Sequence, residues 1–229
     1  MNICKLKLKY NIKAVLWDMD GVLIDSMEFD LKICNQLLTK IIDKAISIPE
    51  LTIRKYFAYA HQQFWKGILS DIQITLSNTQ LLKLLEEYDK ERTIFEYTLL
   101  PGVIETLNKL KKEELKLAVV SSNEVYLIES ILKNKNIRSY FDIVVGYDTK
   151  SPIHAKQMNK KPSPDMYNAA LALLGISAEE AAVIEDSIAG ATAGLNAGCT
   201  VIGVSTGGAT FEELVALLKG KNGYVMNTL

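Results

Sequence analysis

The stretch KAVLWDMDG, residues 13–21, places a short apolar run directly before two carboxylates and a glycine. Such a run predicts a strand that is buried on both faces, as in a parallel sheet between two layers of helices. Asp18 and Asp20 then leave the sheet at its carboxyl end, where Gly21 allows a sharp turn beside a ligand. In isolation, however, the four letters DMDG fit a simple turn or a helix cap equally well.

Short apolar runs of the same kind recur along the chain. They cover residues 116–120, 141–145, 181–184 and 200–204. Amphipathic segments lie between them, for example Val103, Leu107 and Leu110, and then Met166, Ala169, Ala170, Leu173 and Leu174 after Pro164. This alternation predicts an α/β fold with a doubly wound, Rossmann-like parallel sheet, whose ligand site lies beyond the carboxyl ends of the strands.

Residues 27–98 have a helical pattern throughout. Their apolar faces are formed by Ile33, Leu37, Leu38, Ile41 and Ile42, by Ile53, Phe57, Ala60 and Phe64, and by Leu81, Leu84, Leu85 and Tyr88. The pattern predicts a small all-helical cap domain inserted after the first strand, with residues 1–26 and 99–229 forming the α/β core. Leu100, Pro101 and Gly102 would be the hinge at the return to the core.

Composition and charge exclude several classes of protein. The chain has 229 residues, 48% of them hydrophobic, and its 26 basic and 27 acidic residues give a net charge of -1. This balance does not favour binding to nucleic acid or to an anionic membrane. No apolar run is long enough to span a membrane, and the alternation from Lys5 to Tyr10 predicts a strand rather than a signal peptide. We therefore expect a cytoplasmic protein.

The three cysteines predict no disulfide framework or metal site. Cys4, Cys34 and Cys199 are far apart, form no CxxC pair and have no histidine at ligand spacing. Free thiols in a reducing compartment are the expected state.

Two acidic clusters are expected to meet at one edge of the sheet. Glu185 and Asp186 end an apolar run in the same way as Asp18 and Asp20 do. Carboxylates crowded in this way repel one another unless a cation joins them. Mg²⁺ fits this oxygen-rich set, whereas the histidine and cysteine ligands of a zinc site are missing.

Two further elements would bind an anion. Ser121, Ser122 and Asn123 follow a strand and precede a helix expected to begin near Glu124, which is the place of an anion cradle, although Ser and Asn there also serve as ordinary caps. Lys161 is fixed between a second lysine and Pro162, although a single lysine is more often found on the surface.

In combination, these motifs resemble those of the haloacid dehalogenase-like hydrolases. The resemblance lies in DMDGVLIDS at 18–26, VVSSN at 119–123, KPSPD at 161–165 and VIEDSIAG at 183–190, in the order and with the spacing of that family. The helical insert resembles the small cap of the subgroup that contains phosphoglycolate phosphatase and β-phosphoglucomutase. The resemblance implies a hydrolase of phosphoric monoesters.

The resemblance also implies a role for each matching residue. Asp18 would be the nucleophile that forms an aspartyl-phosphate, and Asp20 the acid/base. Asp18, Asp186 and the main-chain carbonyl of Asp20 would bind Mg²⁺, and Glu185 would bind it directly or through water. Ser121, Ser122, Asn123 and Lys161 would hold the phosphate. An acidic residue at position 20 is typical of the phosphatases and mutases of the family, which argues against carbon–halogen cleavage.

One departure from the pattern of the family favours hydrolysis over the mutase reaction. The family's mutases typically present a histidine twelve residues after the nucleophile, and this chain has Asp30 there. The expected function is therefore Mg²⁺-dependent hydrolysis of a small sugar, polyol or hydroxy-acid phosphate, with a phosphosugar mutase as the alternative. A catalytically silent phosphate-binding protein of the same fold is a second alternative. A receiver domain is disfavoured, because there the acidic pair precedes the phosphorylated Asp and no cap is present.

The sequence leaves the substrate-selecting residues open. Arg54, Lys55, Gln62 and Lys66 in the cap are unranked candidates. His61 stands among aromatic residues and is expected to pack, whereas His154 lies in a long loop at 148–160 and is expected to be exposed. The expected partner is a small-molecule phosphate ester, and the expected state is a monomer or weak homodimer.

Overall fold

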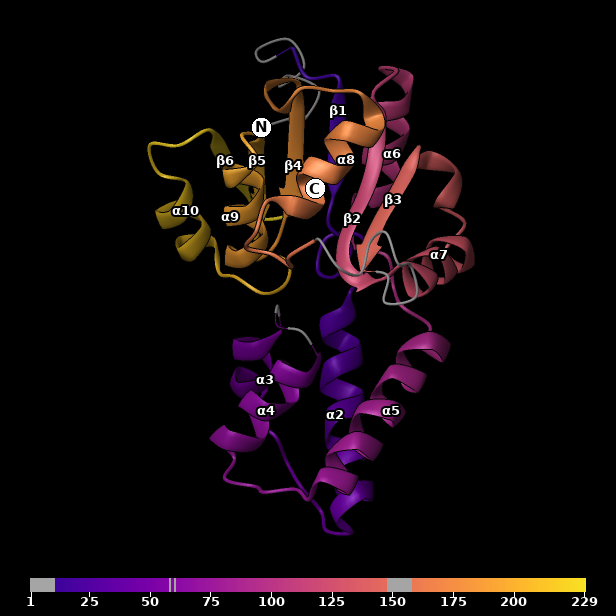
Figure 1. Cartoon of the computed structure of the whole chain (residues 1–229), viewed down its shortest axis with the longest axis vertical. Coiled ribbons are helices and arrows are strands. Elements are labelled where there is room, and N and C mark those ends of the chain that lie inside the picture. Colours follow the sequence, from indigo (N-terminus) through magenta and orange to yellow (C-terminus); the bar gives the residue numbers. More distant parts are fainter. Residues whose placement is uncertain (1–10, 58, 60, 148–157) are drawn as a thin grey trace.

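A computed structural model describes residues 11–57, 59, 61–147 and 158–229 of the chain (Figure 1). The strand predicted at Lys5–Tyr10 lies outside these residues, as do Cys4 and His154. Among the described helices, none combines the length and the apolar character that crossing a membrane requires.

A six-stranded sheet forms the core of the described chain. Its strands are β1 (Ala14–Trp17), β2 (Lys116–Glu124), β3 (Ile143–Tyr147), β4 (Ala181–Glu185), β5 (Thr200–Val204) and β6 (Gly223–Met226). All neighbouring strands are parallel, in the order β3-β2-β1-β4-β5-β6. The central strand β1 is therefore flanked by β2 and β4, the two strands whose ends carry the other predicted site residues.

The strands differ from the sequence prediction chiefly at β2, β3 and β6. β2 continues to Glu124 instead of ending at Ser121, with an irregularity in its pairing to β3 after Val120. β3 begins at Ile143, because residues 138–140 form a short 3-10 helix (Arg138–Tyr140) and the next two residues connect this helix to the strand. The edge strand β6 was not predicted. It is only four residues long and half-buried, so it lacks the apolar run that marks the buried strands.

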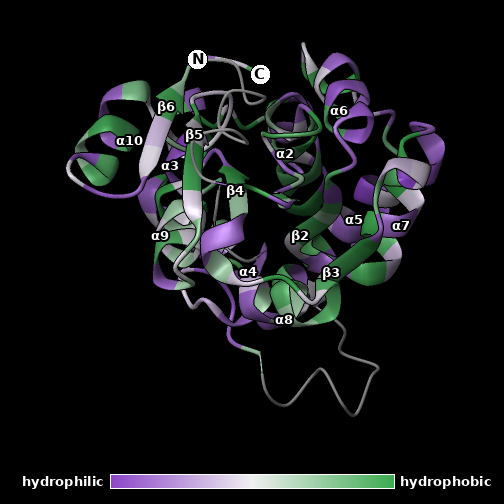
Figure 2. Cartoon of the chain, turned by 90° about the horizontal axis from the view of Figure 1, so that it is seen from above, coloured by the Kyte–Doolittle hydropathy of each residue, from purple (hydrophilic) through white to green (hydrophobic). Residues whose placement is uncertain are grey.

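Helices cover both faces of the sheet. Val15 and Trp17 point into the cluster formed with α6 (Val103–Lys112) and α7 (Val125–Asn134), whereas Ala14 and Leu16 point into the opposite one. That second cluster is covered by α8 (Asp165–Leu174), α9 (Ile188–Asn196) and α10 (Phe211–Leu218), with a 3-10 helix at Ala178–Glu180. Figure 2 shows the mostly apolar inner strands with helices on both sides of them. The predicted α/β fold is confirmed.

Helix α8 buries Met166, Ala170 and Leu174 as predicted, but its buried face also extends to a side that was not expected. In α8 the buried residues include Tyr167 and Leu171, whereas Leu173 is 65% exposed. The helix starts at Asp165, and its buried positions then recur at three- and four-residue steps that leave Leu173 outside. The consequence for the site is that Tyr167 points inward.

Four helices lie between β1 and α6. They are α2 (Ser26–Ile42), α3 (Glu50–Tyr56), α4 (His61–Asp71) and α5 (Asn78–Ile94). Asp25 caps α2 by accepting from the backbone N–H of Glu28, and Ser77 forms a capping box with Gln80 at the start of α5. Figure 1 shows these helices as a separate layer at the end of the core to which the strands point. A helical cap therefore follows the first strand.

The chain enters and leaves the cap side by side. The backbone N–H of Asp25 donates to the carbonyl of Thr98 at 2.9 Å, and that of Leu100 donates to Leu23 at 3.0 Å. Ile24 and Leu99 form an antiparallel bridge between them. The cap is thus attached next to the end of β1. The domain limits at 26/27 and 98/99 stay a prediction.

Candidate active site

Three buried carboxylates meet at the carboxyl ends of β1 and β4. Asp18, Glu185 and Asp186 are 8%, 0% and 1% exposed, and one oxygen atom of each lies within 4.8 Å of the others. They come together because β1 and β4 are neighbouring parallel strands, paired from Ala14 with Ala181 to Trp17 with Ile184. The structure therefore joins the two acidic clusters that the sequence predicts to meet.

Lys161 places a cation between two of these carboxylates. Its Nζ donates to Asp18 Oδ1 at 2.7 Å, to Glu185 Oε1 at 2.6 Å and to the main-chain carbonyl of Val120 at 2.9 Å. Its side chain is 7% exposed. Burial alone would lower the pKa of Lys161, but Asp18 and Glu185 raise it well above its usual value. The lysine is a fixed positive charge beside Asp18.

Glu185 is held from several sides. Tyr167 donates its hydroxyl to Oε1 at 2.6 Å, and Ser187 donates to Oε2 at 3.2 Å. A Cβ on Gly190 would overlap with the Glu185 carboxylate, so a larger residue at this position of α9 would displace that carboxylate. Tyr167 was not among the predicted site residues. The amphipathic pattern predicted for α8 did not include it.

Asp186 is enclosed by backbone. Gly208 donates its N–H to Asp186 Oδ2 at 2.6 Å, and a side chain on Gly21 or Gly207 would collide with the same carboxylate. Gly21 also has a φ of +71°, which favours glycine. Burial and the neighbouring carboxylates raise the pKa of Asp186, and burial and Glu185 raise that of Asp18.

The charge and chemistry of this cluster fit a divalent metal. Three carboxylates share one lysine, which leaves two buried negative charges uncompensated when all are ionised. Buried charges of this kind are normally paired or bind a metal. All three offer oxygen, the ligand type of Mg²⁺ and other hard divalent ions.

The predicted phosphate-binding residues lie beside the carboxylates. Ser121 is 1% exposed, and its hydroxyl accepts from the backbone N–H of Asn123 at 3.3 Å and from the Asn123 amide at 3.1 Å. Ser122 lines a cavity together with Ser121, Asp18 and Asp186. These residues belong to the extended end of β2, and α7 begins afterwards at Val125.

Asp20 is bound by one residue from the core and one from the cap. The Asn123 amide donates to Asp20 Oδ2 in a short hydrogen bond. Arg92 Nη2, from α5, lies 3.2 Å from Asp20 Oδ1 and 3.1 Å from Asn123 Oδ1. Arg92 was not among the predicted site residues. Arg92 lies one turn beyond Tyr88 on the apolar stripe of Leu81, Leu84, Leu85 and Tyr88. A charged residue on a face expected to be buried is the sequence signal that could have marked it as a site residue.

A cavity of about 500 Å³ joins the carboxylates to the cap. Its lining includes, from the core, Asp18, Asp20, Ser121, Ser122, Asn123, Lys161 and Asp186, and, from the cap, Asp30, Phe57, His61, Gln62, Phe64, Leu85, Tyr88, Asp89 and Arg92. Asp30 accepts a hydrogen bond from Tyr88 at 2.6 Å. His61 packs edge-on against Tyr88 and lies 2.7 Å from Asp89, so the expectation that it packs agrees with these contacts.

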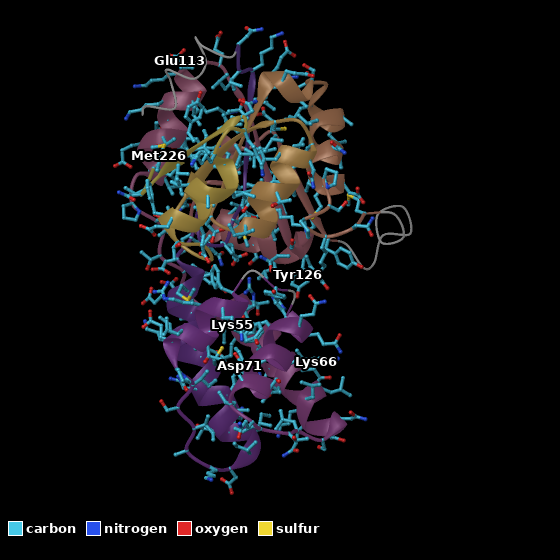
Figure 3. The ribbon with its side chains drawn as sticks, turned by 90° about the vertical axis from the view of Figure 1, so that its left-hand side faces the viewer. Lys55, Lys66, Asp71, Glu113, Tyr126 and Met226 are labelled. Carbon is cyan, nitrogen blue, oxygen red and sulfur yellow. The ribbon has the colours of Figure 1, made fainter. Side chains whose placement is uncertain are left out.

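The predicted substrate-selecting candidates separate into two groups. Gln62 lines the cavity, whereas Arg54, Lys55 and Lys66 do not. Arg54 pairs with Glu50 on its own helix, and Lys55 donates to Asp71 at 2.7 Å. Figure 3 shows Lys55 and Asp71 near each other in the cap, with Lys66 at its edge. The charged groups of the cap that face the cavity are instead Asp30, Asp89 and Arg92.

The model of the family called haloacid dehalogenase-like hydrolase matches residues 15–204. This chain belongs to the haloacid dehalogenase-like hydrolases. The predictions of this family and of a hydrolase are therefore confirmed. The match begins in β1 and ends with β5, so it includes all the carboxylates of the site.

Several curated proteins are similar over most of this chain. A phosphoglycolate phosphatase of Nitrosospira multiformis is 30% identical over 86% of this chain and 84% of its own length. A beta-phosphoglucomutase of Bacillus subtilis is 29% identical, with the same two coverages. The protein SUPPRESSOR OF QUENCHING 1 of Arabidopsis thaliana is 27% identical over 85% of this chain, which spans only 18% of that protein.

Solved structures share the fold. A HAD family hydrolase from Deinococcus radiodurans R1, with bound phosphate and sodium, has a TM-score of 0.74 at 25% identity and covers 96% of this chain and 92% of its own. A HAD hydrolase of Entamoeba histolytica has a TM-score of 0.74 at 24% identity, with coverages of 95% and 93%.

Proposed function

We propose that this protein is a Mg²⁺-dependent phosphomonoesterase that hydrolyses a small phosphorylated metabolite through an aspartyl-phosphate. The observation that carries the proposal is the contact of Lys161 with Asp18 beside Asp186. This contact brings a carboxylate nucleophile, a fixed cation and a metal-binding carboxylate together at the carboxyl ends of β1 and β4. These are the parts that phosphoryl transfer requires.

In the first step, an Asp18 oxygen attacks phosphorus, the bond from phosphorus to the leaving oxygen breaks, and Asp20 gives its proton to that oxygen. In the second step, a water oxygen attacks phosphorus, Asp20 takes the proton of that water, and the bond from phosphorus to Asp18 breaks. Ser121, Ser122 and the charge of Lys161 hold the phosphoryl oxygens in both steps, while the Asn123 amide donates to Asp20 and Ser121.

Asp18, Asp186 and the main-chain carbonyl of Asp20 would hold Mg²⁺. When bound, the ion supplies positive charge that joins the carboxylates to the phosphate and stabilises the transition state. Glu185 contributes by fixing Lys161, since its oxygens accept from Lys161, Tyr167 and Ser187.

The leaving group would occupy the cap side of the cavity. A sugar or polyol fits this lining better than a hydroxy acid does. Arg92 is already paired with Asp20, and Asp89 offers a carboxylate that attracts hydroxyl groups and repels another carboxylate. The size of the cavity agrees with a small metabolite. A cytoplasmic location and a monomer or weak homodimer stay predictions.

A phosphosugar mutase is the second candidate. It rests on the link that Arg92 makes between the cap and Asp20, since a mutase requires a cap residue near its acid/base, although position 30 is not histidine.

A panel of phosphorylated metabolites, scored for phosphate release with and without Mg²⁺, tests the proposal. It includes sugar, polyol and hydroxy-acid phosphates together with p-nitrophenyl and phenyl phosphate. We expect metal-dependent release that is fastest from a sugar or polyol phosphate. No release from any ester would contradict the proposal, and faster release from hydroxy-acid phosphates would contradict the choice of leaving group.

A further inference from the structure

Arg92 is a cap residue whose charge is buried against the core. Its side chain is 5% exposed, and it lies near the end of α5. Its Nη2 reaches Asp20 at the end of β1 and Asn123 at the end of β2. A single side chain of the cap thus contacts two residues of the core site.

The two oxygens of Asp20 have different partners. Oδ1 pairs with the Arg92 guanidinium, and Oδ2 accepts from the Asn123 amide. Asn123 Oδ1 accepts from the same Nη2 of Arg92, which closes a ring of three side chains. Charge-assisted hydrogen bonds are stronger and more directional than neutral ones. The ring therefore fixes both the position and the plane of the Asp20 carboxylate.

The interior of the cap fixes Arg92 in turn. Its guanidinium carbon lies 5.8 Å from the centre of the Phe29 ring and 5.9 Å from that of Tyr88. Tyr88, one turn earlier on α5, donates its hydroxyl to Asp30 on α2. Asp30 therefore joins the two helices that carry these rings. The residue at the position of the mutase histidine helps to place Arg92 instead of reaching Asp20 itself.

Stability alone does not account for an arginine at this position. The preceding buried residues on its face of α5 are Leu84 and Tyr88, and an apolar residue could continue that face without the cost of burying a charge. Arg92 Nε is buried and has no hydrogen-bond partner among the described residues. Burial of the guanidinium therefore costs desolvation free energy. Its contact with Asp20 is the feature that an apolar residue at this position could not replace.

We propose that Arg92 is a positioning residue, through which the cap holds the acid/base Asp20 in place for both proton transfers. This inference rests on the proposed function. In this role Arg92 acts through Asp20 and Asn123, not on phosphorus or the leaving oxygen. It sets the direction in which Asp20 gives a proton to the leaving oxygen in the first step and takes one from water in the second.

The two steps can be separated by the choice of leaving group. Nitrophenolate leaves readily without a proton, whereas the less acidic phenol needs one from Asp20. With p-nitrophenyl phosphate, a defect in Asp20 therefore spares formation of the aspartyl-phosphate but slows its hydrolysis. With phenyl phosphate, the same defect slows both steps.

The experiment compares Arg92→Met and Arg92→Lys with the wild type by rapid quench on both aryl phosphates. For Arg92→Met we expect kcat to fall about 100-fold on both esters. A burst close to one equivalent of nitrophenolate should remain, with no burst of phenol. Arg92→Lys keeps a charge but loses the planar fork that reaches both Asp20 and Asn123, so we expect an intermediate loss with the same burst.

Arg54→Met is the matched control, since Arg54 lies on α3 and pairs with Glu50 at the surface. It should leave kcat and the burst unchanged. Two results would overturn the role of Arg92. One is wild-type kinetics in Arg92→Met, and the other is a nitrophenolate burst in this variant that falls as much as kcat does. If this variant does not fold, Arg92→Lys decides, and wild-type rates in it overturn the role as well. A wild type that hydrolyses no ester of the panel would overturn the proposed function instead.

Discussion

Lys161 Nζ lies 2.7 Å from Asp18 Oδ1, which joins two residues that are 143 positions apart in the chain. The same nitrogen lies 2.6 Å from Glu185, so the lysine cannot turn away from the sheet without leaving two buried carboxylates unpaired. Lys161 thereby fixes the direction of Asp18 and favours its charged form, against the burial that raises the pKa of Asp18.

The first prediction concerns Asp18 itself. Asp18→Asn removes the nucleophilic charge with almost no change in shape, so turnover should fall by at least about 1,000-fold while the fold is kept. Steady-state phosphate release and thermal unfolding check this. Appreciable activity in a folded, metal-loaded variant would contradict the covalent mechanism.

The second prediction separates Lys161 from its neighbour. Lys161→Met removes the cation that touches Asp18, so kcat/KM should fall by about 100- to 1,000-fold. Lys160 lies over the Tyr147 ring, 4.5 Å from its centre, and Lys160→Met should change kcat/KM by less than about threefold. Because Lys161→Met also leaves Glu185 without its ion pair, unfolding must be measured in parallel. Similar losses in two folded variants would mean that the lysine motif is misplaced.

The third prediction concerns the metal. Without a divalent ion, Asp18, Asp186 and the phosphate repel one another, so chelation should abolish activity and Mg²⁺ should restore it. Mg²⁺ should also raise the Tm of the wild type and raise it less in Asp186→Asn, because an ion that binds the folded state stabilises it. A rate that survives exhaustive chelation would remove the metal from the mechanism.

The short motifs made most of the carboxylate site predictable. Asp18 and Asp20 come just after β1, and Glu185 and Asp186 stand at the end of β4; parallel strands bring these ends to one edge. The predictions failed where a role depends on packing between elements. Arg92 reaches Asn123 because α5 lies near the end of β2. A sequence pattern predicts on which face of α5 Arg92 lies, but it does not predict which residue Arg92 contacts.

The fourth prediction is a pH dependence of stability from Asp30. Burial raises the pKa of Asp30 from 3.8 to about 7, although Arg92 opposes the shift. A raised pKa means that the folded state keeps a proton that the unfolded chain releases, so this contribution is present below pH 4 and is lost as the pH rises towards 7. Its size is at most about 4 kcal/mol.

Asp30→Asn keeps an acceptor for Tyr88 but cannot ionise. Urea unfolding should therefore find its stability, relative to the wild type, higher at pH 8 than at pH 5. Asp43→Asn, an exposed substitution at the end of the same helix, should show no such change. An equal difference at both pH values would show that Asp30 ionises normally in the folded state.

The last prediction distinguishes the phosphatase from the mutase. A mutase must keep water away from its aspartyl-phosphate until the sugar phosphate returns, which requires a cap group that controls when Asp20 engages. Asp30 cannot be that group in this structure, because it accepts from Tyr88 inside the cap. Arg92 holds Asp20 by a fixed ion pair and carries no proton that it could exchange at neutral pH. Water therefore meets an acid/base that is already in place.

Hydrolysis should win for this reason. Given β-glucose 1-phosphate and a trace of glucose 1,6-bisphosphate, an enzyme that acts on this sugar should release inorganic phosphate and should not accumulate glucose 6-phosphate. Phosphorus NMR follows both products in one sample, and Asp18→Asn supplies the blank. Efficient isomerisation with little phosphate release would make the mutase the function of this chain. Arg92 would then be the first cap residue to test as a substitute for the histidine, because it is the cap residue in contact with Asp20 among those the structure describes.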